Sequence, residues 1–117
     1  MDVKTDGSRY ALLSVSNKDY IVEFAKRICE LGFNILSTGG TAKVLTKHQI
    51  PVVDIASYTQ EEESLSGRVK TIHPKIFSGI LFDRDNEDHV KTIQMKGIVS
   101  IDLVVVNFYP FYKEAIE

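Results

Sequence analysis

Short apolar runs alternate with amphipathic patterns along this chain, as expected of strands that are joined by helices. Residues 10–15 form the first apolar run and predict a short buried strand. Apolar residues spaced three and four apart over 18–31 then predict a helix that ends at Gly32. Ser16 has the side chain of an N-cap and Asp19 follows three residues later, so we expect a capping box at the start of that helix.

The middle of the chain predicts two further strands with a helix between them. Residues 33–36 and 52–55 are the strands, and a turn over residues 37–41 leads into a helix that stops before Pro51. Residues 56–74 have no clear period and predict a loop. A loop of that length in so small a domain is typical of functional or mobile segments.

The last third of the chain contains the strongest strand pattern. Residues 76–82 are apolar and predict either a helix or a strand. Residues 86–96 predict a helix with Val90 and Ile93 facing inward. Residues 101–108 are apolar at almost every position, which is typical of a strand that is covered on both faces.

This alternation predicts an α/β protein in which a mostly parallel sheet lies between two layers of helices. We expect residues 1–9 to be an N-terminal tail and residues 10–117 to form one domain. Ligands bind such sheets beyond the carboxyl ends of the strands. Polar segments leave three predicted strands at those ends, at residues 14–18, 37–41 and 107–110, so we expect them to converge on one pocket.

Several cations in these segments suit a phosphorylated ligand. Residues 67–75 gather an arginine, two lysines, a threonine and a histidine. If that segment is extended, Arg68 and Lys70 point to the same side, where they suit a phosphate or a carboxamide oxygen. Lys18 lies in a predicted first helical turn, where a cation is unfavourable unless an anion is bound. Solvated surface charges are the alternative interpretation for all three.

Other candidates supply hydrogen bonds or proton transfer. Gly39 and Gly40 let a ligand approach the backbone, and the helix that follows offers its amides to a phosphate, although a plain turn is the alternative. His73 is either a proton carrier or a structural histidine. Asn107 offers both donors and an acceptor to a base, and Tyr109 either stacks on a ligand or packs in a turn.

Composition excludes several classes of function. A net charge of −2 over 117 residues gives no basic field that attracts nucleic acid or a membrane. No apolar run is long enough to span a bilayer, and we see no secretory signal. The single cysteine, Cys29, excludes an internal disulfide and fits the cytoplasm. Neither metal-ligand spacing nor a dinucleotide or ATP motif is present.

Four segments together carry a resemblance to a known family, and they read S-V-S-N-K, S-T-G-G-T-A-K, G-R-V-K-T-I-H-P-K and V-N-F-Y-P-F. From about Tyr10 onward the chain resembles the IMP cyclohydrolase domain. That domain is the N-terminal half of a bifunctional purine-biosynthesis enzyme that also carries AICAR formyltransferase. The resemblance implies a methylglyoxal-synthase-like α/β fold. It also implies dehydrative ring closure of FAICAR to IMP, with neither cofactor nor metal.

The resemblance also implies roles for individual residues. Lys70, Thr71 and Tyr109 would be catalytic, with Lys70 stabilising charge on the formyl oxygen as the ring closes. The implied substrate-binding residues are Ser16, Asn17, Lys18, Thr38, Gly39, Gly40, Thr41, Arg68, Val69, Lys70, Thr71, Val106 and Asn107. The implied partners are a purine nucleotide (FAICAR or IMP), a second copy in a homodimer, and a transformylase domain in the full-length protein.

The chain departs from the family in several respects. It lacks the transformylase half, and residues 61–66 stand where the family usually has a F-P-E-M-like run. The family continues with a D-I-G-G segment and a lysine assigned to proton transfer, and this chain ends at Glu117 before both. We therefore expect a domain truncated at its C-terminus that binds IMP-like nucleotides weakly and turns over FAICAR poorly or not at all. Two alternatives remain open. One is a methylglyoxal-synthase-like lyase, although residues 67–70 lack its aspartate, and the other is a non-catalytic ligand-sensing domain of the same fold.

Overall fold

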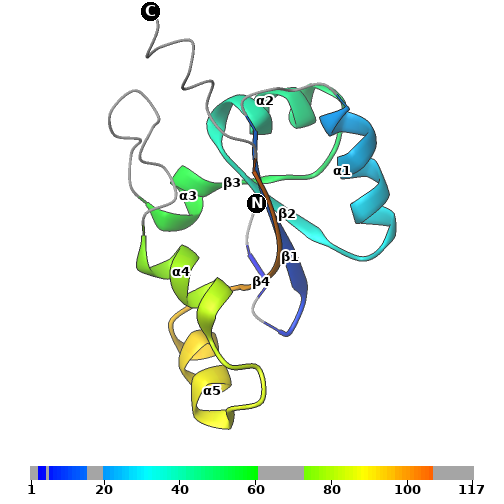
Figure 1. The fold of residues 1–117 in the computed structure, drawn as a ribbon. Helices are drawn as coiled ribbons and strands as arrows, with labels where there is room; N and C mark the ends of the chain where they lie inside the picture. Colours follow the sequence, from blue (N-terminus) through cyan, green and yellow to red (C-terminus); the bar gives the residue numbers. More distant parts are fainter. Residues whose placement is uncertain (1–2, 5, 16–19, 61–72, 107–117) are drawn as a thin grey trace, which may run out of the picture.

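The computed structural model describes residues 3–4, 6–15, 20–60 and 73–106, in which the first three strands alternate with helices and three helices precede the last strand (Figure 1). The strands are β1 (Arg9–Ser14), β2 (Asn34–Ser37), β3 (Val53–Asp54) and β4 (Ser100–Val106). The helices are α1 (Ile21–Glu30), α2 (Gly39–Lys47), α3 (Ile55–Thr59), α4 (Pro74–Leu81) and α5 (Glu87–Met95). Within this part of the chain no helix is long and apolar enough to cross a membrane.

The strands form one parallel sheet in the order β3-β2-β1-β4. β1 is paired on both sides, so that Leu12 lies opposite Leu36 of β2 and Val104 of β4. The register between β1 and β4 shifts once, between Tyr10 and Ala11. The parallel sheet confirms the predicted fold class, and it places the carboxyl ends of β1, β2 and β4 at the same edge.

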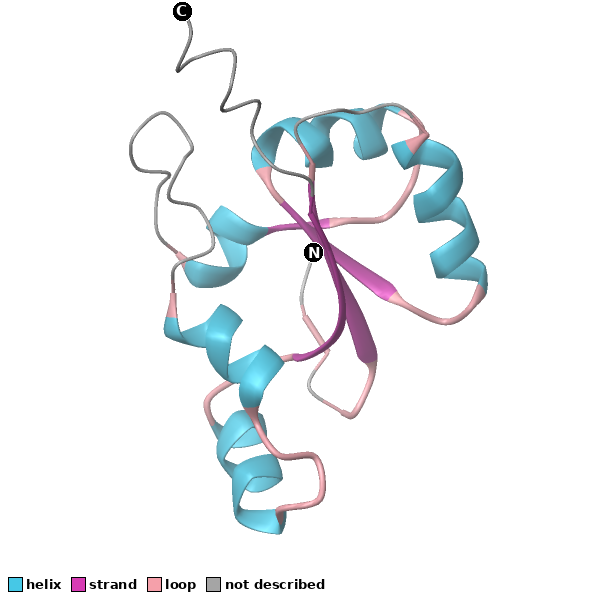
Figure 2. Cartoon of the chain, in the orientation of Figure 1, coloured by secondary structure: helices cyan, strands magenta, loops and turns pink. Residues whose placement is uncertain are grey.

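Helices cover both faces of the sheet, which gives the predicted three layers (Figure 2). Successive residues of β1 point to opposite faces. Tyr10 and Leu12 belong to the core cluster that also contains Tyr58 of α3 and Ile76 of α4. The residues between and beyond them face the other core cluster, which contains Ala11, Leu13, Ile21, Ala25, Ile28, Ile35 and Leu45. β1 therefore contributes to both cores, as does β2 with Leu36 in the first cluster and Ile35 in the second.

The first helix begins later than the sequence predicted. α1 starts at Ile21, and Tyr20 takes the N-cap position with a φ of 64° and no side-chain cap. Ser16 and Asp19, the expected capping box, lie outside the described residues. The apolar repeat explains the difference, because the buried positions of the helix are Ile21, Ala25 and Ile28 and none precedes them.

Two segments predicted as irregular contain helices instead. The turn expected over residues 37–41 is short, because β2 extends to Ser37 and α2 begins at Gly39. The loop expected over residues 56–74 begins inside α3, whose N-cap Asp54 accepts a hydrogen bond from the Ala56 amide at 3.0 Å. A helix of five residues is too short to produce a readable period. β3 accordingly has two residues and not the four expected.

The ambiguous run over residues 76–82 lies in a helix. α4 starts with Pro74, which suits the first helical position, and the ring of its N-cap His73 accepts from the Lys75 amide at 3.1 Å. The helix predicted over residues 86–96 is present as α5. Its N-cap Asn86 accepts from two amides of the first turn, and Ile93 is buried as expected.

β4 is not covered on both faces by the described residues, contrary to the prediction from its apolar sequence. Among the described strands it lies at one side of the sheet, and burial alternates along it. Val104 and Val106 are 43% and 57% exposed. Val104 lies opposite Leu12 of β1, which is buried. Apolar composition alone does not distinguish a central strand from an edge strand.

Gly79 allows α4 to pack directly on β4. A Cβ atom placed on Gly79 would lie 2.5 Å from the Val99 carbonyl oxygen and 3.2 Å from the Ile101 side chain. Glycine is therefore required here by a close approach and not by an unusual backbone angle. Tyr58 of α3 reaches the same region, where its buried hydroxyl accepts from the Val99 amide at 2.9 Å.

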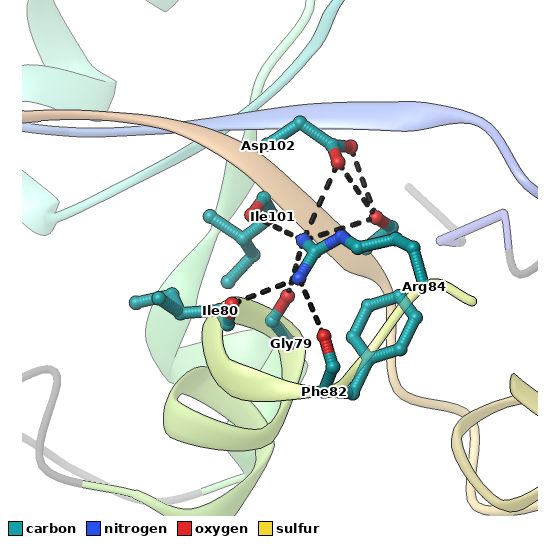
Figure 3. A network of polar contacts seen from close by, with 7 residues as sticks. Gly79, Ile80, Phe82, Arg84, Ile101 and Asp102 are labelled. Atoms are coloured by element: carbon teal, nitrogen blue, oxygen red, sulfur yellow. Dashed lines mark hydrogen bonds and ion pairs between the residues drawn. The ribbon is translucent and has the colours of Figure 1, made fainter. Parts of the chain in front are cut away.

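Arg84 joins the end of α4 to the start of β4 (Figure 3). Its guanidinium donates to three carbonyl oxygens near the end of α4, those of Gly79, Ile80 and Phe82. It also donates to the Ile101 carbonyl at 2.9 Å and forms an ion pair with Asp102 at 3.3 Å. The guanidinium carbon lies 4.1 Å from the centroid of the Phe82 ring. α4 is thus fixed to the edge strand by both packing and charge.

The close approach at Gly79 predicts an unusual sign for Gly79→Ala. In an ordinary helix interior this change stabilises by about 1 kcal/mol. Here we expect it to destabilise by about 1–3 kcal/mol, because the methyl group displaces the Val99 backbone. Urea unfolding measures the difference, with Ser78→Ala on the same helix as the control expected to stay near the native value. A Gly79→Ala chain more stable than the native one would contradict this packing.

Candidate functional site

Hydroxyl groups tie the carboxyl ends of β1 and β2 together. The buried Ser37 donates its hydroxyl to the Leu13 carbonyl oxygen at 2.9 Å. The hydroxyl of Thr38 donates to that of Ser14 at 3.4 Å. These contacts join two strands at the edge where ligands bind parallel sheets. The backbone that leaves β2 is therefore held against the end of β1.

Thr41 extends this link from the strands to α2. Its side chain is fully buried and donates to the Val15 carbonyl oxygen at 3.3 Å. The same hydroxyl oxygen accepts from the Val15 amide at 3.5 Å. The first turn of α2 is thus fastened to the residue that follows β1. The position of α2 relative to the sheet is therefore set by short side chains that have few rotamers.

The N-terminus of α2 lies at this edge with its amides uncapped by a side chain. Thr38 is the N-cap residue and has an extended backbone, but its hydroxyl is directed to Ser14 and caps no helix amide. The Ala42 amide is the first that bonds within the helix, to the Thr38 carbonyl at 2.7 Å. The amides of Gly39, Gly40 and Thr41 precede it. Such a turn combines free donors with the positive end of the helix dipole, which favours an anion.

A hollow of about 410 Å³ lies beside the same helix. It is lined in part by Gly39, by Lys43 and Lys47, and by Asp54 at the end of β3. Lys43 and Lys47 are exposed and stand four residues apart on α2, an arrangement in which like charges repel. A bound anion would reduce that repulsion. The two lysines and the amides at the start of α2 therefore both favour an anion.

The start of α4 is organised by side chains that already have structural partners. Lys75 donates its ammonium to the Tyr58 carbonyl at 3.2 Å, and the same ammonium lies 5.1 Å from the centroid of the Tyr58 ring. His73 caps α4 through its ring nitrogen. These contacts favour the structural interpretation of His73 over a role in proton transfer.

The structure describes some of the predicted site residues and not others. Thr38, Gly39, Gly40 and Thr41 lie together at the start of α2, and Val106 ends β4 opposite Ser14 of β1, at the same edge. The remaining predicted residues lie outside the described part of the chain, and they are Ser16, Asn17, Lys18, Arg68, Val69, Lys70, Thr71, Asn107 and Tyr109. The sequence placed Ser14 and Ser37 in the polar segments at the strand ends but did not predict the hydroxyl contacts that they make. Their signal is a small hydroxyl residue at the end of an apolar run.

Neither a metal site nor a reactive thiol is found in the described residues. No group of three or more His, Cys, Asp or Glu side chains there has the geometry to hold a metal ion. Partial burial raises the pKa of the Cys29 thiol, which disfavours the thiolate that nucleophilic chemistry requires. The described part of the site therefore offers hydrogen bonds and positive potential.

Comparison with known proteins identifies the family. The family model described as the MGS-like domain matches residues 20–116 of this chain. The chain belongs to the family of MGS-like domains. A solved structure described as the crystal structure of ForH superimposes with a TM-score of 0.74 at 34% identity. That match covers 87% of this chain and 53% of ForH, and it confirms the fold that the four sequence segments implied.

Curated relatives of this MGS-like domain are much longer than the chain itself. The chain is 51% identical over 93% of its length to the bifunctional purine biosynthesis protein PurH of Thermoanaerobacter sp. strain X514. It is 53% identical to the proteins of the same name from Caldicellulosiruptor saccharolyticus and Clostridium acetobutylicum, over 93% and 92% of its length. In each case the match covers 21% of the relative, so the chain spans about a fifth of these proteins.

The link between α2 and β1 predicts the effect of Thr41→Val. The substitution keeps the shape of the side chain but removes a buried hydroxyl that bonds the Val15 backbone. We expect a loss of about 1–2 kcal/mol in the free energy of unfolding. Thr46→Val on the exposed side of the same helix is the control and should change it little. Equal urea midpoints for the two variants would show that the hydroxyl link does not hold the helix.

Proposed function

We propose that this MGS-like domain binds a purine nucleotide and contributes the IMP cyclohydrolase site of a purine biosynthesis protein. The proposal is based on the first turn of α2. Its uncapped amides lie at the carboxyl edge of the sheet, where hydroxyl links to β1 hold them in place. The identity of 51–53% to proteins named bifunctional purine biosynthesis protein PurH supports the choice of ligand.

The phosphate of the nucleotide binds at the start of α2 in this proposal. The amides of Gly40 and Thr41 donate to its oxygens, and the helix dipole and Lys43 add positive potential. Gly39 and Gly40 keep the approach to the backbone open. Thr38 and Thr41 position this turn through their hydroxyl contacts to Ser14 and Val15.

The rest of the nucleotide extends toward the end of β4. Val106 and Asn107 line the base pocket, and Ser16, Asn17 and Lys18 contact the nucleotide from the end of β1. Arg68, Val69, Lys70 and Thr71 contribute from the segment between α3 and α4. These assignments follow the family motifs. The position of Val106 at the carboxyl end of β4, opposite Ser14, supports them.

The proposed reaction closes the purine ring of FAICAR and releases water. The carboxamide nitrogen attacks the formyl carbon, and loss of the formyl oxygen as water gives IMP. Because the reaction is intramolecular, holding the carboxamide nitrogen against the formyl carbon accounts for much of the reduction in the activation barrier. Lys70, Thr71 and Tyr109 are the proposed catalytic residues, and Lys70 stabilises the developing negative charge on the formyl oxygen. In this proposal the protein works in the cytoplasm as a homodimer, with a transformylase domain in the full-length protein.

Thermal unfolding with candidate ligands tests the proposed ligand. We expect IMP to raise the melting temperature by several degrees at saturation, because a ligand present at 100 times its Kd stabilises the native state by about 2.7 kcal/mol. UMP and dihydroxyacetone phosphate should shift it less. Stabilisation by dihydroxyacetone phosphate alone would favour a lyase, and stabilisation by UMP alone would favour a ligand-sensing domain.

Gly40→Asp tests the position of the phosphate. Gly40 is exposed in the first turn of α2, where a carboxylate interacts favourably with the helix dipole but repels a phosphate. We expect the free energy of unfolding to stay near the native value while the affinity for IMP falls at least about tenfold. Gly40→Asn is the matched neutral control, because it adds a side chain of the same size without the charge, and by isothermal calorimetry it should bind IMP more tightly than Gly40→Asp. Equal affinities of the two variants would place the phosphate elsewhere.

A further inference from the structure

A second concave surface lies between α4 and α5, away from the proposed nucleotide site. The groove has a volume of about 340 Å³, within the range of pockets that bind small ligands. Its residues come from α4, from α5 and from the segments that follow each helix, and they are Phe77, Ser78, Leu81, Phe82, His89, Thr92, Ile93, Lys96 and Ile98. α5 also lies near the amino ends of the strands, since Val90 and Ile93 share another hollow with Arg9 and Ser100.

The walls of this groove are apolar and unusually accessible. Phe77 is 47% exposed and Leu81 is 74% exposed, although both are large apolar side chains. Phe82 is held in place by the guanidinium of Arg84 over its ring. Ile93 is the buried residue of α5 and forms the floor with Ile98. Clustered apolar side chains at the surface of a folded domain are typical of binding sites.

The polar groups of the groove favour an anion. No acidic residue lines it among the described residues, whereas Lys96 and His89 both do. The Lys96 ammonium has no hydrogen bond or ion pair to any described residue. The Nδ1 atom of His89 accepts from the Asp83 amide at 3.1 Å, so the neutral ring carries its proton on Nε2 and is a donor there. The groove thus combines an apolar floor with donors and a positive charge at its rim.

We infer that the α4–α5 groove is a second binding site, and that its ligand is a small amphipathic anion. An aromatic or aliphatic body fills the space between Phe77, Leu81 and Ile93, and a carboxylate or sulfonate contacts Lys96. The site lies apart from the start of α2, and it requires neither the nucleotide nor the proposed reaction. Its failure and the failure of the proposed function are therefore separate experimental results.

Two matched fluorescent probes test this inference on the intact chain. 8-Anilino-1-naphthalenesulfonate is an aromatic anion, and N-phenyl-1-naphthylamine has the same ring framework without the sulfonate. We expect the anion to bind saturably at one site and more tightly than the neutral probe. Lys96→Gln should raise the Kd of the anion about threefold to fivefold, as expected for a partly exposed ion pair, and leave that of the neutral probe unchanged.

Control variants separate the groove from the general surface. Lys91→Gln makes the same charge change at an exposed position of α5 that does not line the groove, and it should leave both Kd values unchanged. Leu81→Ser should weaken both probes, and its exposure makes the fold tolerant of the change. Both variants should keep the native melting shift with IMP.

Four results would overturn the inference. Equal effects of Lys96→Gln and Lys91→Gln would mean that no specific charge contact forms, and absence of saturable binding would mean that there is no site. Displacement of the anionic probe by IMP would place the probe at α2. The fourth result has two parts: probe binding is lost at high protein concentration, and the Leu81→Ser chain stays monomeric in sedimentation. Together they would assign the groove to a second copy of the chain.

Discussion

The parallel pairing of β1 with both of its neighbours is the constraint on which the candidate site depends. β1 contributes alternate residues to two cores, so neither face can move without disturbing the packing of helices on that side. Because β2 and β4 run parallel to it, their carboxyl ends meet at one edge. Ser37 and Thr41 then fasten the start of α2 to β1 at that edge. The orientation of the α2 amides is a consequence of this pairing.

Much of the fold could be predicted from sequence because the relevant signals are local. The spacing of Ile21, Ala25 and Ile28 predicts α1, and the apolar runs predict β1, β2 and β4. The short helix α3 was not predicted, and the strand β3 was predicted two residues too long, because neither is long enough to show a period. The exposure of Val104 and Val106 depends on the position of β4 at the edge of the sheet, which composition does not encode.

The candidate site was predictable in part for a similar reason. Two glycines between a strand and a helix identified the start of α2, and the structure confirms that Thr38 to Thr41 lie at the carboxyl edge of the sheet. The hydroxyl contacts of Ser14 and Ser37 were not predicted, since they join residues that are far apart in the sequence. The proposed roles of Lys70, Thr71 and Tyr109 remain predictions from the family motifs.

Amide chemical shifts decide whether the nucleotide binds at the start of α2, because they report on the α2 amides themselves. In a titration of the ¹⁵N-labelled chain with IMP, we expect the largest shifts at the amides of Gly39, Gly40 and Thr41. Gly79 and Gly97, which lie at the end of α4 and after α5, should change little. If IMP binds saturably, shifts the amide signal of Gly97 and leaves those of the α2 amides unchanged, the phosphate does not bind at the start of α2.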